Sequence, residues 1–257
     1  MLEFIEKIAR EAGRIAVEGG THLTAGQIHA KGTPTDMVTE IDRRVEEFLV
    51  DAIRRRYPEH GIFGEETGRT AGSSAWCWVI DPIDGTTSFI HGFPYYSISI
   101  ACRKEGRTEA GVVYAPRLGE LFRAERGRGA QLNGDTIHVS DCAELKSALM
   151  ATGFACVRAG VRPDNLDLMP ELVRSIQGVR RCGSAALDLC NVAAGRFDGY
   201  WEWGLQLYDI AAGALILEEA GGRITDYSGG AEYPEKGVAA TNGLLQEKLL
   251  PFLVRKS

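Results

Sequence analysis

The spacing of apolar residues changes its period part-way along the chain, and that change restricts the folds available to it. Over residues 2–18 apolar residues recur every three or four positions, which predicts an amphipathic helix. A second helix is predicted from Asp36 to Arg56, ending before Pro58. From Trp76 onward apolar residues come in short runs or alternate with small polar residues, as they do in strands. The chain is therefore predicted to combine helices and sheet in an α+β fold.

The strands expected next are short and are separated by turns that contain glycine. They cover residues 76–80, 96–102, 111–115, 120–124 and 136–139, and we expect an antiparallel sheet behind the two helices. Beyond Ser140, strands at 148–151 and 197–203 are mixed with helices at 166–176, 184–194, 207–220 and 243–254. We interpret the chain as one compact unit with two halves, residues 1–140 and 141–257.

The composition is that of an ordinary globular protein, with 257 residues of which 44% are hydrophobic and 25% charged. Acidic residues outnumber basic ones, 35 to 29, so a protein that coats nucleic acid is not expected. Charges close to Met1 argue against a signal peptide, and the longest uncharged stretch, residues 85–102, is too rich in Gly, Pro and His for a membrane span. The six cysteines show no metal-finger spacing, and we expect mostly buried thiols in a reducing cytoplasm.

A pair of acids at a predicted strand end carries the clearest chemical signal. The run that starts at Trp78 ends in Asp81, and Asp84 follows within a turn that Pro82 and Gly85 favour. Two carboxylates this close, with a backbone carbonyl between them, match the oxygen ligands that Mg²⁺ and Ca²⁺ require. Asp, Pro and Gly are also ordinary turn residues, so the segment alone leaves a turn and a metal site open.

Further acids lie at predicted element ends or inside an apolar stripe. Glu65 and Glu66 follow a short apolar segment, where Glu66 alternatively belongs to a solvated face. Asp42 projects into the apolar stripe of the second helix, and it needs a partner there because burying an unpaired carboxylate is costly. Asp209 begins the helix at 207–220, a position where the helix dipole alone also favours an acid.

At these residues the sequence resembles the inositol monophosphatase family of metal-dependent phosphatases. Three motifs carry the resemblance, in family order: Gly64-Glu65-Glu66, Asp81-Pro82-Ile83-Asp84-Gly85-Thr86-Thr87, and Tyr208-Asp209-Ile210-Ala211-Ala212-Gly213 ahead of Glu219-Ala220-Gly221-Gly222. The resemblance spans nearly the whole chain and implies a layered α-β-α-β-α sandwich. The sequence departs from the family at Ser88, commonly Asn, and at Tyr208, usually Trp, and neither position supplies a metal oxygen in the family.

The resemblance implies two to three Mg²⁺ ions per subunit, held by oxygen atoms. The matching ligands are Glu65, Asp81 and the carbonyl of Ile83 for the first ion, Asp81, Asp84 and Asp209 for the second, and Glu65 near a third. It also implies that Glu65 and Thr86 orient and deprotonate the attacking water, and that Asp42 hydrogen-bonds Thr86. Clustered carboxylates repel one another, so cations at this place are physically reasonable.

Phosphate binding is expected at the backbone amides of Gly85, Thr86 and Thr87, which follow a turn and open a helix. The same amides also suit an ordinary helix cap, and the two roles are compatible. Lys31 matches a lysine on a mobile loop of the family, although a single exposed lysine is usually only solvated.

For the substrate, the resemblance places Gly183, Ser184, Ala185 and Glu202 against the inositol ring. A carboxylate accepts hydrogen bonds from hydroxyl groups, which suits Glu202, although an exposed strand acid is the alternative for this residue. The arginines within residues 153–181 either bind a second phosphate or line the surface.

The function implied is Mg²⁺-dependent, Li⁺-sensitive hydrolysis of inositol monophosphate by a cytoplasmic homodimer that needs no membrane. Fructose 1,6-bisphosphate, 3′-phosphoadenosine nucleotides and histidinol phosphate remain alternative substrates, because related branches use the same chemistry. A regulatory protein that binds RNA or transcription machinery is the alternative of another class, and the acidic balance argues against nucleic acid as the main ligand. An inactive sugar-phosphate binder is disfavoured because every motif acid is present.

Overall fold

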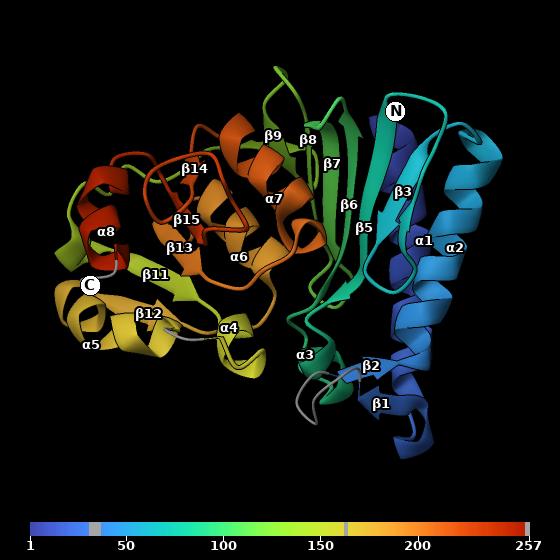
Figure 1. Ribbon diagram of the computed structural model, residues 1–257, viewed down its shortest axis with the longest axis horizontal. Coiled ribbons are helices and arrows are strands. Elements are labelled where there is room, and N and C mark those ends of the chain that lie inside the picture. Colours follow the sequence, from blue (N-terminus) through green and yellow to red (C-terminus); the bar gives the residue numbers. More distant parts are fainter. Residues whose placement is uncertain (31–36, 162–163, 255–257) are drawn as a thin grey trace.

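The computed structural model describes residues 1–30, 37–161 and 164–254 (Figure 1). Its helices are α1 (Leu2–Thr21), α2 (Glu40–Arg56), α3 (Thr86–Ile90), α4 (Ala155–Arg158), α5 (Asn165–Ser175), α6 (Ala185–Ala193), α7 (Leu207–Glu219) and α8 (Gln246–Leu253). Its strands are β1 (Ile28–Ala30), β2 (Met37–Thr39), β3 (Gly61–Gly64), β4 (Gly68–Thr70), β5 (Trp76–Asp84), β6 (Ser97–Lys104), β7 (Arg107–Ala115), β8 (Glu120–Glu125), β9 (Ala130–Leu132), β10 (Asp135–Ile137), β11 (Leu149–Thr152), β12 (Gly178–Arg180), β13 (Gly199–Glu202), β14 (Arg223–Thr225) and β15 (Val238–Thr241). Short 3₁₀ helices cover Ala25–Gln27 and Leu145–Ser147.

The larger sheet has the strand order β10-β9-β8-β7-β6-β5-β3-β4. Most neighbours are antiparallel, as the sequence predicts, but β3 pairs with β5 in parallel. The register places Gly64 opposite Ile80, so the residues that follow these two, Glu65 beyond the end of β3 and Asp81 within β5, lie side by side. The carboxyl ends of parallel strands meet at one sheet edge, and this pairing therefore brings two of the predicted ligands together.

Helices and sheets alternate in layers, which confirms the expected α-β-α-β-α sandwich (Figure 1). Helices α1 and α2 cover one face of the larger sheet, while α6 and α7 pack on its other face. The second sheet, with the order β12-β11-β13-β15-β14, lies beyond α6 and α7. Helices α5 and α8 close its outer side, where Leu172 and Leu249 join Met150 and Trp201 in one apolar cluster. In the sequence, all strands of the larger sheet precede residue 140, where we infer a boundary between two halves, and all strands of the second sheet follow it.

Small residues let the central helix layer approach the larger sheet and pack tightly within itself. A Cβ atom on Gly111 of β7 would lie 3.0 Å from the Cα of Ala212 in α7, and one on Gly213 would lie 2.9 Å from Leu189 in α6. Interiors are close-packed, so a larger residue at Gly213 forces the two helices apart. The position of α7 matters for the site because Asp209 lies in its first turn.

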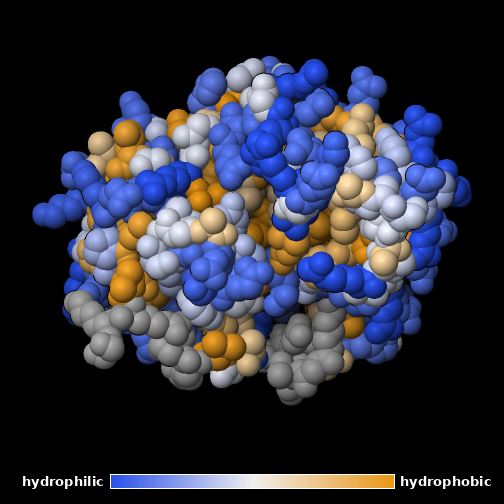
Figure 2. Space-filling model, turned by 45° about the horizontal axis from the view of Figure 1, so that its top comes forward, coloured by the Kyte–Doolittle hydropathy of each residue, from blue (hydrophilic) through white to orange (hydrophobic). Residues whose placement is uncertain are grey.

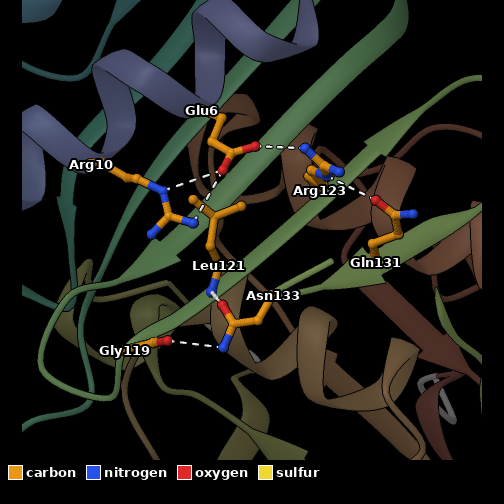
Figure 3. Close-up of polar contacts among 7 residues, drawn as sticks. All are labelled: Glu6, Arg10, Gly119, Leu121, Arg123, Gln131 and Asn133. Atoms are coloured by element: carbon orange, nitrogen blue, oxygen red, sulfur yellow. Dashed lines mark hydrogen bonds and ion pairs between the residues drawn. The ribbon is translucent and has the colours of Figure 1, made fainter. Parts of the chain in front are cut away.

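On the surface beside α1, polar contacts tie the first helix to the sheet (Figure 3). Arg123 of β8 donates to Glu6 of α1 at 2.6 Å and to Gln131 of β9 at 2.9 Å. Asn133, which lies between β9 and β10, accepts a hydrogen bond from the backbone amide of Leu121 at 2.9 Å and thereby ties this turn to β8. These groups are partly exposed, so the ion pair stabilises the fold by about 1 kcal/mol or less.

Several element boundaries differ from those predicted. The second helix begins at Glu40 and not at Asp36, because Thr39 caps it by accepting hydrogen bonds from the amides of Ile41 and Asp42. Residues Met37–Thr39 form a strand that pairs with β1. The sequence predicts that most of the cysteines are buried, and this is only half right. Three of the free thiols are buried, whereas those of Cys77, Cys142 and Cys182 are partly exposed.

Hydrophilic side chains cover much of the face drawn in Figure 2, and apolar residues appear between them in separate patches. Most large apolar side chains lie instead in clusters on both sides of each sheet. Among the described helices, none has both the length and the apolar character that crossing a bilayer requires.

Candidate active site

Asp81 and Asp84 both reach the same site because β5 contains a bulge. Asp81 pairs with Ser99 of β6 and Asp84 with Ser97, so the segment from Asp81 to Asp84 is one residue longer than its partner. In a regular strand, residues three positions apart point to opposite faces, and one extra residue restores them to the same face. The turn predicted here comes later than expected: β5 continues to Asp84, the turn lies at Gly85, and Pro82 lies in the bulge, where a missing N–H is tolerated.

Asp209 completes this acidic group from the other half of the chain. Carboxylate oxygens of Asp81, Asp84 and Asp209 all lie within 4.8 Å of one another. The backbone amide of Gln206 donates to one oxygen of Asp209 at 2.6 Å, as in a helix cap. The two readings of Asp209 are thus compatible, because a carboxylate has two oxygens with several lone pairs.

Asp84 is fixed by the beginning of α6. The Ser184 hydroxyl donates to it at 2.6 Å, and the amides of Ala185 and Ala186 approach at 3.3 and 2.7 Å. The positive end of the helix dipole suits a carboxylate in this position. Ser184 and Ala185, predicted to contact substrate, are buried and bond this acid, whereas Gly183 lines the cavity beside it.

Burial and mutual repulsion disfavour simultaneous ionisation of the three acids. Burial raises the pKa of Asp84 to about 6 despite its bonds to α6. Burial raises the pKa of Asp81 as well, and the neighbouring charges of Glu65, Asp84 and Asp209 add to the rise. The pKa of Asp209 is raised by the same two causes, burial and the charge of Asp84. Clustered, desolvated oxygen donors of this kind fit a hard divalent cation, which relieves the repulsion.

Glu65 joins the group from the end of β3 and hydrogen-bonds Asp81. Its loop is held by Glu46 of α2, a residue that the sequence analysis missed. Glu46 is fully buried and accepts hydrogen bonds from the amides of Glu66 at 2.9 Å and Thr67 at 2.7 Å. A Cβ on Gly64 would lie 2.4 Å from the Glu46 carboxylate, so glycine at this position makes room for it. The signal was present in the sequence, because Glu46 lies one helical turn after Asp42.

Asp42 is fully buried, as its place in the apolar stripe predicts. It accepts hydrogen bonds from the amide and hydroxyl of Thr39, and the Thr86 hydroxyl donates to its other oxygen at 3.1 Å. Burial raises the pKa of Asp42, while the bonds from Thr39 oppose the rise. The Thr86 hydroxyl also lies 3.2 Å from the carbonyl of Ile83.

The predicted phosphate segment opens α3. Gly85 has φ 101°, a left-handed conformation that favours glycine, and it is the residue before the first turn of the helix. A Cβ here would also lie 3.1 Å from the carbonyl of Gly183. Amides in the first turn of a helix have no acceptor within the helix, so those of Thr86 and Thr87 suit an anion.

One open cavity connects these groups. Its lining comprises Met37, Glu65, Asp81, Ile83, Asp84, Gly85, Thr86, Thr87, Arg158, Arg181, Gly183 and Asp209. Two arginines of the segment 153–181, Arg158 and Arg181, therefore line the cavity. The sequence alone left open whether the arginines of this segment bind a phosphate or line the surface. Lys31 lies outside the described residues.

Glu202 is buried at the end of β13, so the alternative of an exposed strand acid is wrong. Its oxygens accept from the Tyr200 hydroxyl at 2.6 Å and from the amide of Ala155 at 2.8 Å. The charge of Glu202 acts on both Asp84 and Asp209, which places it close behind the acidic group.

The two departures from the family motifs lie close to the predicted ligands in the sequence. Tyr208 packs its ring edge-on against Phe63 of β3, with centroids 5.6 Å apart, so an aromatic contact is kept between α7 and β3. Ser88 is buried within α3.

Comparison with known proteins gives a consistent result. A model of the inositol monophosphatase family matches residues 1–256. A relative from Pseudomonas aeruginosa named Nus factor SuhB is 46% identical over 244 residues, covering 92% of this chain and 89% of the relative. The structure of an inositol monophosphatase from Anabaena (Nostoc) sp. matches with a TM-score of 0.88 and 37% identity, over 98% of this chain and 94% of that one. The extragenic suppressor protein suhB from Bartonella henselae matches with a TM-score of 0.92 and 36% identity, over 99% and 98%.

Proposed function

This chain belongs to the inositol monophosphatase family, and we propose that it is a Mg²⁺-dependent phosphomonoesterase that hydrolyses inositol monophosphate. One observation carries the proposal. Acids from distant parts of the chain, Asp81, Asp84 and Asp209, bring carboxylate oxygens within 4.8 Å of one another in an open cavity. Burying these acids together without a catalytic or binding role is costly, so their convergence supports a metal centre.

The ligands we propose are oxygen atoms only. They are the carboxylates of Glu65, Asp81, Asp84 and Asp209 and the carbonyl of Ile83, which all line one cavity. This donor set fits Mg²⁺, which prefers carboxylates and keeps several waters. When bound there, Mg²⁺ supplies positive charge that neutralises phosphate oxygens and makes nearby water more acidic.

The chain's own groups then bind and orient the reactants. The amides of Gly85, Thr86 and Thr87 hold the phosphate oxygens at the start of α3. Glu65 and the Thr86 hydroxyl position the attacking water, and Glu65 takes its proton. Asp42 accepts a hydrogen bond from the Thr86 hydroxyl, so that the lone pairs of the Thr86 oxygen face the water. Buried Asp42 thus acts through Thr86 and does not touch the substrate.

For the polyol, we propose contacts with Gly183, which lines the cavity, and with Glu202, which is buried close to it. Ser184 and Ala185 are buried and contribute by holding Asp84. Fructose 1,6-bisphosphate, 3′-phosphoadenosine nucleotides and histidinol phosphate offer the same scissile group. The choice among them depends on contacts beyond the phosphate.

A phosphate-release assay over these substrates tests the proposal. We expect release from inositol monophosphate with Mg²⁺, none in excess chelator, and inhibition by Li⁺. Unchanged turnover in chelator would refute the metal centre. Turnover of another substrate in the panel, with inositol monophosphate left intact, would refute the inositol assignment but keep the chemistry. Sedimentation of the same preparation tests the proposed homodimer.

A second candidate function is favoured by the names of relatives. Relatives from several bacteria, including Escherichia coli at 43% identity over 234 residues, are named Nus factor SuhB. We therefore retain binding to transcription machinery as a second proposal, compatible with a cytoplasmic location. Binding that survives Asp209→Asn would separate this role from hydrolysis, and a lack of binding to purified transcription machinery would exclude it.

A further inference from the structure

Two arginines line the cavity that holds the acidic group. Arg158 is the last residue of α4, and Arg181 lies between β12 and α6. Within the described part of the chain, neither guanidinium has an ion pair or a hydrogen bond. Other arginines of the protein do have such partners, for example Arg196, which binds Glu120 through two nitrogens. The cavity therefore combines the acidic group with two cations that have no partner of their own.

The head group of Arg181 is placed by a glycine. Gly183 has φ +104°, and a Cβ on it would lie 2.6 Å from Nη1 of Arg181. The Arg181 guanidinium thus occupies space at the cavity wall that a side chain at position 183 would fill. The carbonyl of Gly183 in turn approaches Gly85, where the phosphate segment begins. Arg181 is therefore separated from that segment by one glycine.

Arg158 approaches from the neighbouring wall. The first amide of α4, that of Ala155, donates to Glu202 at 2.8 Å, which fixes the helix against β13. The charges of Arg158 and Arg181 both act on Glu202, lowering its pKa against the effect of burial. Both arginines therefore lie within electrostatic reach of Glu202, and both line the same cavity as the acidic group.

The positive charge of the two arginines exceeds what a single phosphate requires. The cleaved phosphate already has a cation centre and the amides of α3 in the function proposed above. Hydroxyl groups of an uncharged polyol do not call for guanidinium groups, which suit phosphates and carboxylates because they offer paired donors. We propose that Arg158 and Arg181 bind a second anionic group of the substrate, so that a polyol carrying a second phosphate is preferred over the monophosphate. This inference rests on the proposed function for the cleaved phosphate.

The test compares matched substrates on the full chain with Mg²⁺. The pairs are inositol 1-phosphate with inositol 1,4-bisphosphate, and fructose 1-phosphate with fructose 1,6-bisphosphate. We expect the wild-type chain to hydrolyse at least one bisphosphate with a higher kcat/KM than its monophosphate. Arg158→Gln and Arg181→Gln should each lower that kcat/KM by about tenfold or more, since a charge-assisted hydrogen bond is lost. The monophosphate should change by less than about twofold, as expected for screened charges.

Arg174→Gln is the matched control, because Arg174 is an exposed arginine on α5 of the same segment and does not line the cavity. It should leave both substrates unchanged, and thermal midpoints should show that all variants fold. An equal loss on both substrates would overturn the inference and assign the arginines to the cleaved phosphate. Unchanged kinetics in both variants would overturn it as well.

A binding measurement keeps this inference separable from the proposed function. With Ca²⁺ in place of Mg²⁺, calorimetry reports affinity for the same pairs without relying on turnover. If the wild-type chain cleaves no substrate, the proposed function fails, and the inference then stands only if a bisphosphate binds more tightly than its monophosphate and loses this advantage in both variants. Equal affinities for the two substrates would overturn it.

Discussion

The hydroxyl of Thr86 lies 3.1 Å from a carboxylate oxygen of Asp42, although the two residues are 44 positions apart in the sequence. The same hydroxyl is 3.2 Å from the carbonyl of Ile83. A hydroxyl has one proton, so it donates to one of these acceptors at a time. A charged carboxylate is the stronger acceptor, which leaves the Ile83 carbonyl available to the metal centre that we propose.

This relationship makes Asp42→Asn informative. The amide is able to donate to Thr86, which reverses the bond and turns the threonine proton toward the water. We expect kcat to fall by about a hundredfold, within the usual contribution of a positioned acid–base group. The fold should persist, because the amide oxygen still accepts from Thr39. Asp51→Asn, an exposed acid on the same helix, is the control in a steady-state assay. Near-normal kcat in Asp42→Asn would leave Asp42 with only its capping role.

Asp209→Asn should fold normally yet lose most activity. Asparagine keeps the oxygen that accepts from Gln206, so the helix start is preserved. One charge disappears from the crowded acidic group, and we therefore expect the metal-free variant to melt at a higher temperature than the metal-free wild type at neutral pH. Added Mg²⁺ should raise its melting temperature less. If Mg²⁺ stabilised both proteins equally, Asp209 would not be a ligand.

The pH dependence of stability should reverse its sign when Mg²⁺ is added. Without metal, the raised pKa of Asp84, about 6, means that the folded state binds more protons than the unfolded state between its ordinary value of 3.8 and about 6. Stability contributed by this group is present at the acid end of that window and is lost as pH rises through it. In excess Mg²⁺, protons compete with the ion, so stability should rise with pH instead.

Melting temperatures from pH 4.5 to 7.5 in chelator and in Mg²⁺ provide the measurement. Acids that do not interact with the site contribute equally to both curves, so the difference between the curves reports the site together with groups coupled to it, such as Asp188, whose pKa is raised by burial and also by the charge of Asp84. Asp84→Asn should flatten that difference. Parallel curves in chelator and Mg²⁺ would argue that no cation binds at these carboxylates.

The sequence was most informative where a short motif determines a local shape. Asp81, Asp84 and Asp209 were identified from two motifs, and Asp42 from helical spacing alone. The bulge that aligns Asp81 with Asp84 was not predictable, because it depends on pairing between β5 and β6. A turn and a bulge use the same residue types.

Long-range contacts explain the remaining differences. Parallel pairing of β3 with β5 is set by the packing of distant elements, and it decides where Glu65 emerges. Glu46 was missed because an acid on a helix usually faces solvent, and only the position of the Glu65 loop shows its partners. Arg158 and Arg181 belong to a segment without a motif, so their meeting at one cavity depends on the tertiary fold.

Glu46→Gln should weaken both the fold and the response to metal. The amide group of glutamine donates, so it is unable to accept from one of the two backbone amides that Glu46 now binds. An unpaired buried amide costs about 1–3 kcal/mol, which corresponds to roughly 2 °C or more in melting temperature for a chain of this size. Because the loop carries Glu65, a higher Mg²⁺ concentration should also be needed for half-maximal activity. Glu47→Gln, exposed on the same helix, is the matched control. A stability loss with unchanged Mg²⁺ dependence would make Glu46 a purely structural residue.

The last prediction separates substrate recognition from chemistry at Glu202. Its oxygens accept from Tyr200 and Ala155, but each carboxylate oxygen has a further lone pair for a substrate hydroxyl. Tyr200→Phe removes one protein donor and leaves the carboxylate, whereas Glu202→Gln removes the charge. Loss of hydrogen bonds to a charged acceptor costs about 1.5–3 kcal/mol, so Glu202→Gln should lower kcat/KM for inositol monophosphate about tenfold or more.

Hydrolysis of p-nitrophenyl phosphate should hardly change in Glu202→Gln, because this substrate offers no hydroxyl to Glu202 while the acidic group is intact. Tyr200→Phe should lower the melting temperature without the same selective loss, since the charge that would receive the substrate hydroxyls remains. Equal losses on both substrates in Glu202→Gln would mean that Glu202 supports the wall formed by α4 and β13, or the charge balance of Asp84 and Asp209, and does not recognise the polyol. No loss on either substrate would remove the strongest residue-level support for inositol and would shift the assignment toward substrates recognised by Arg158 and Arg181.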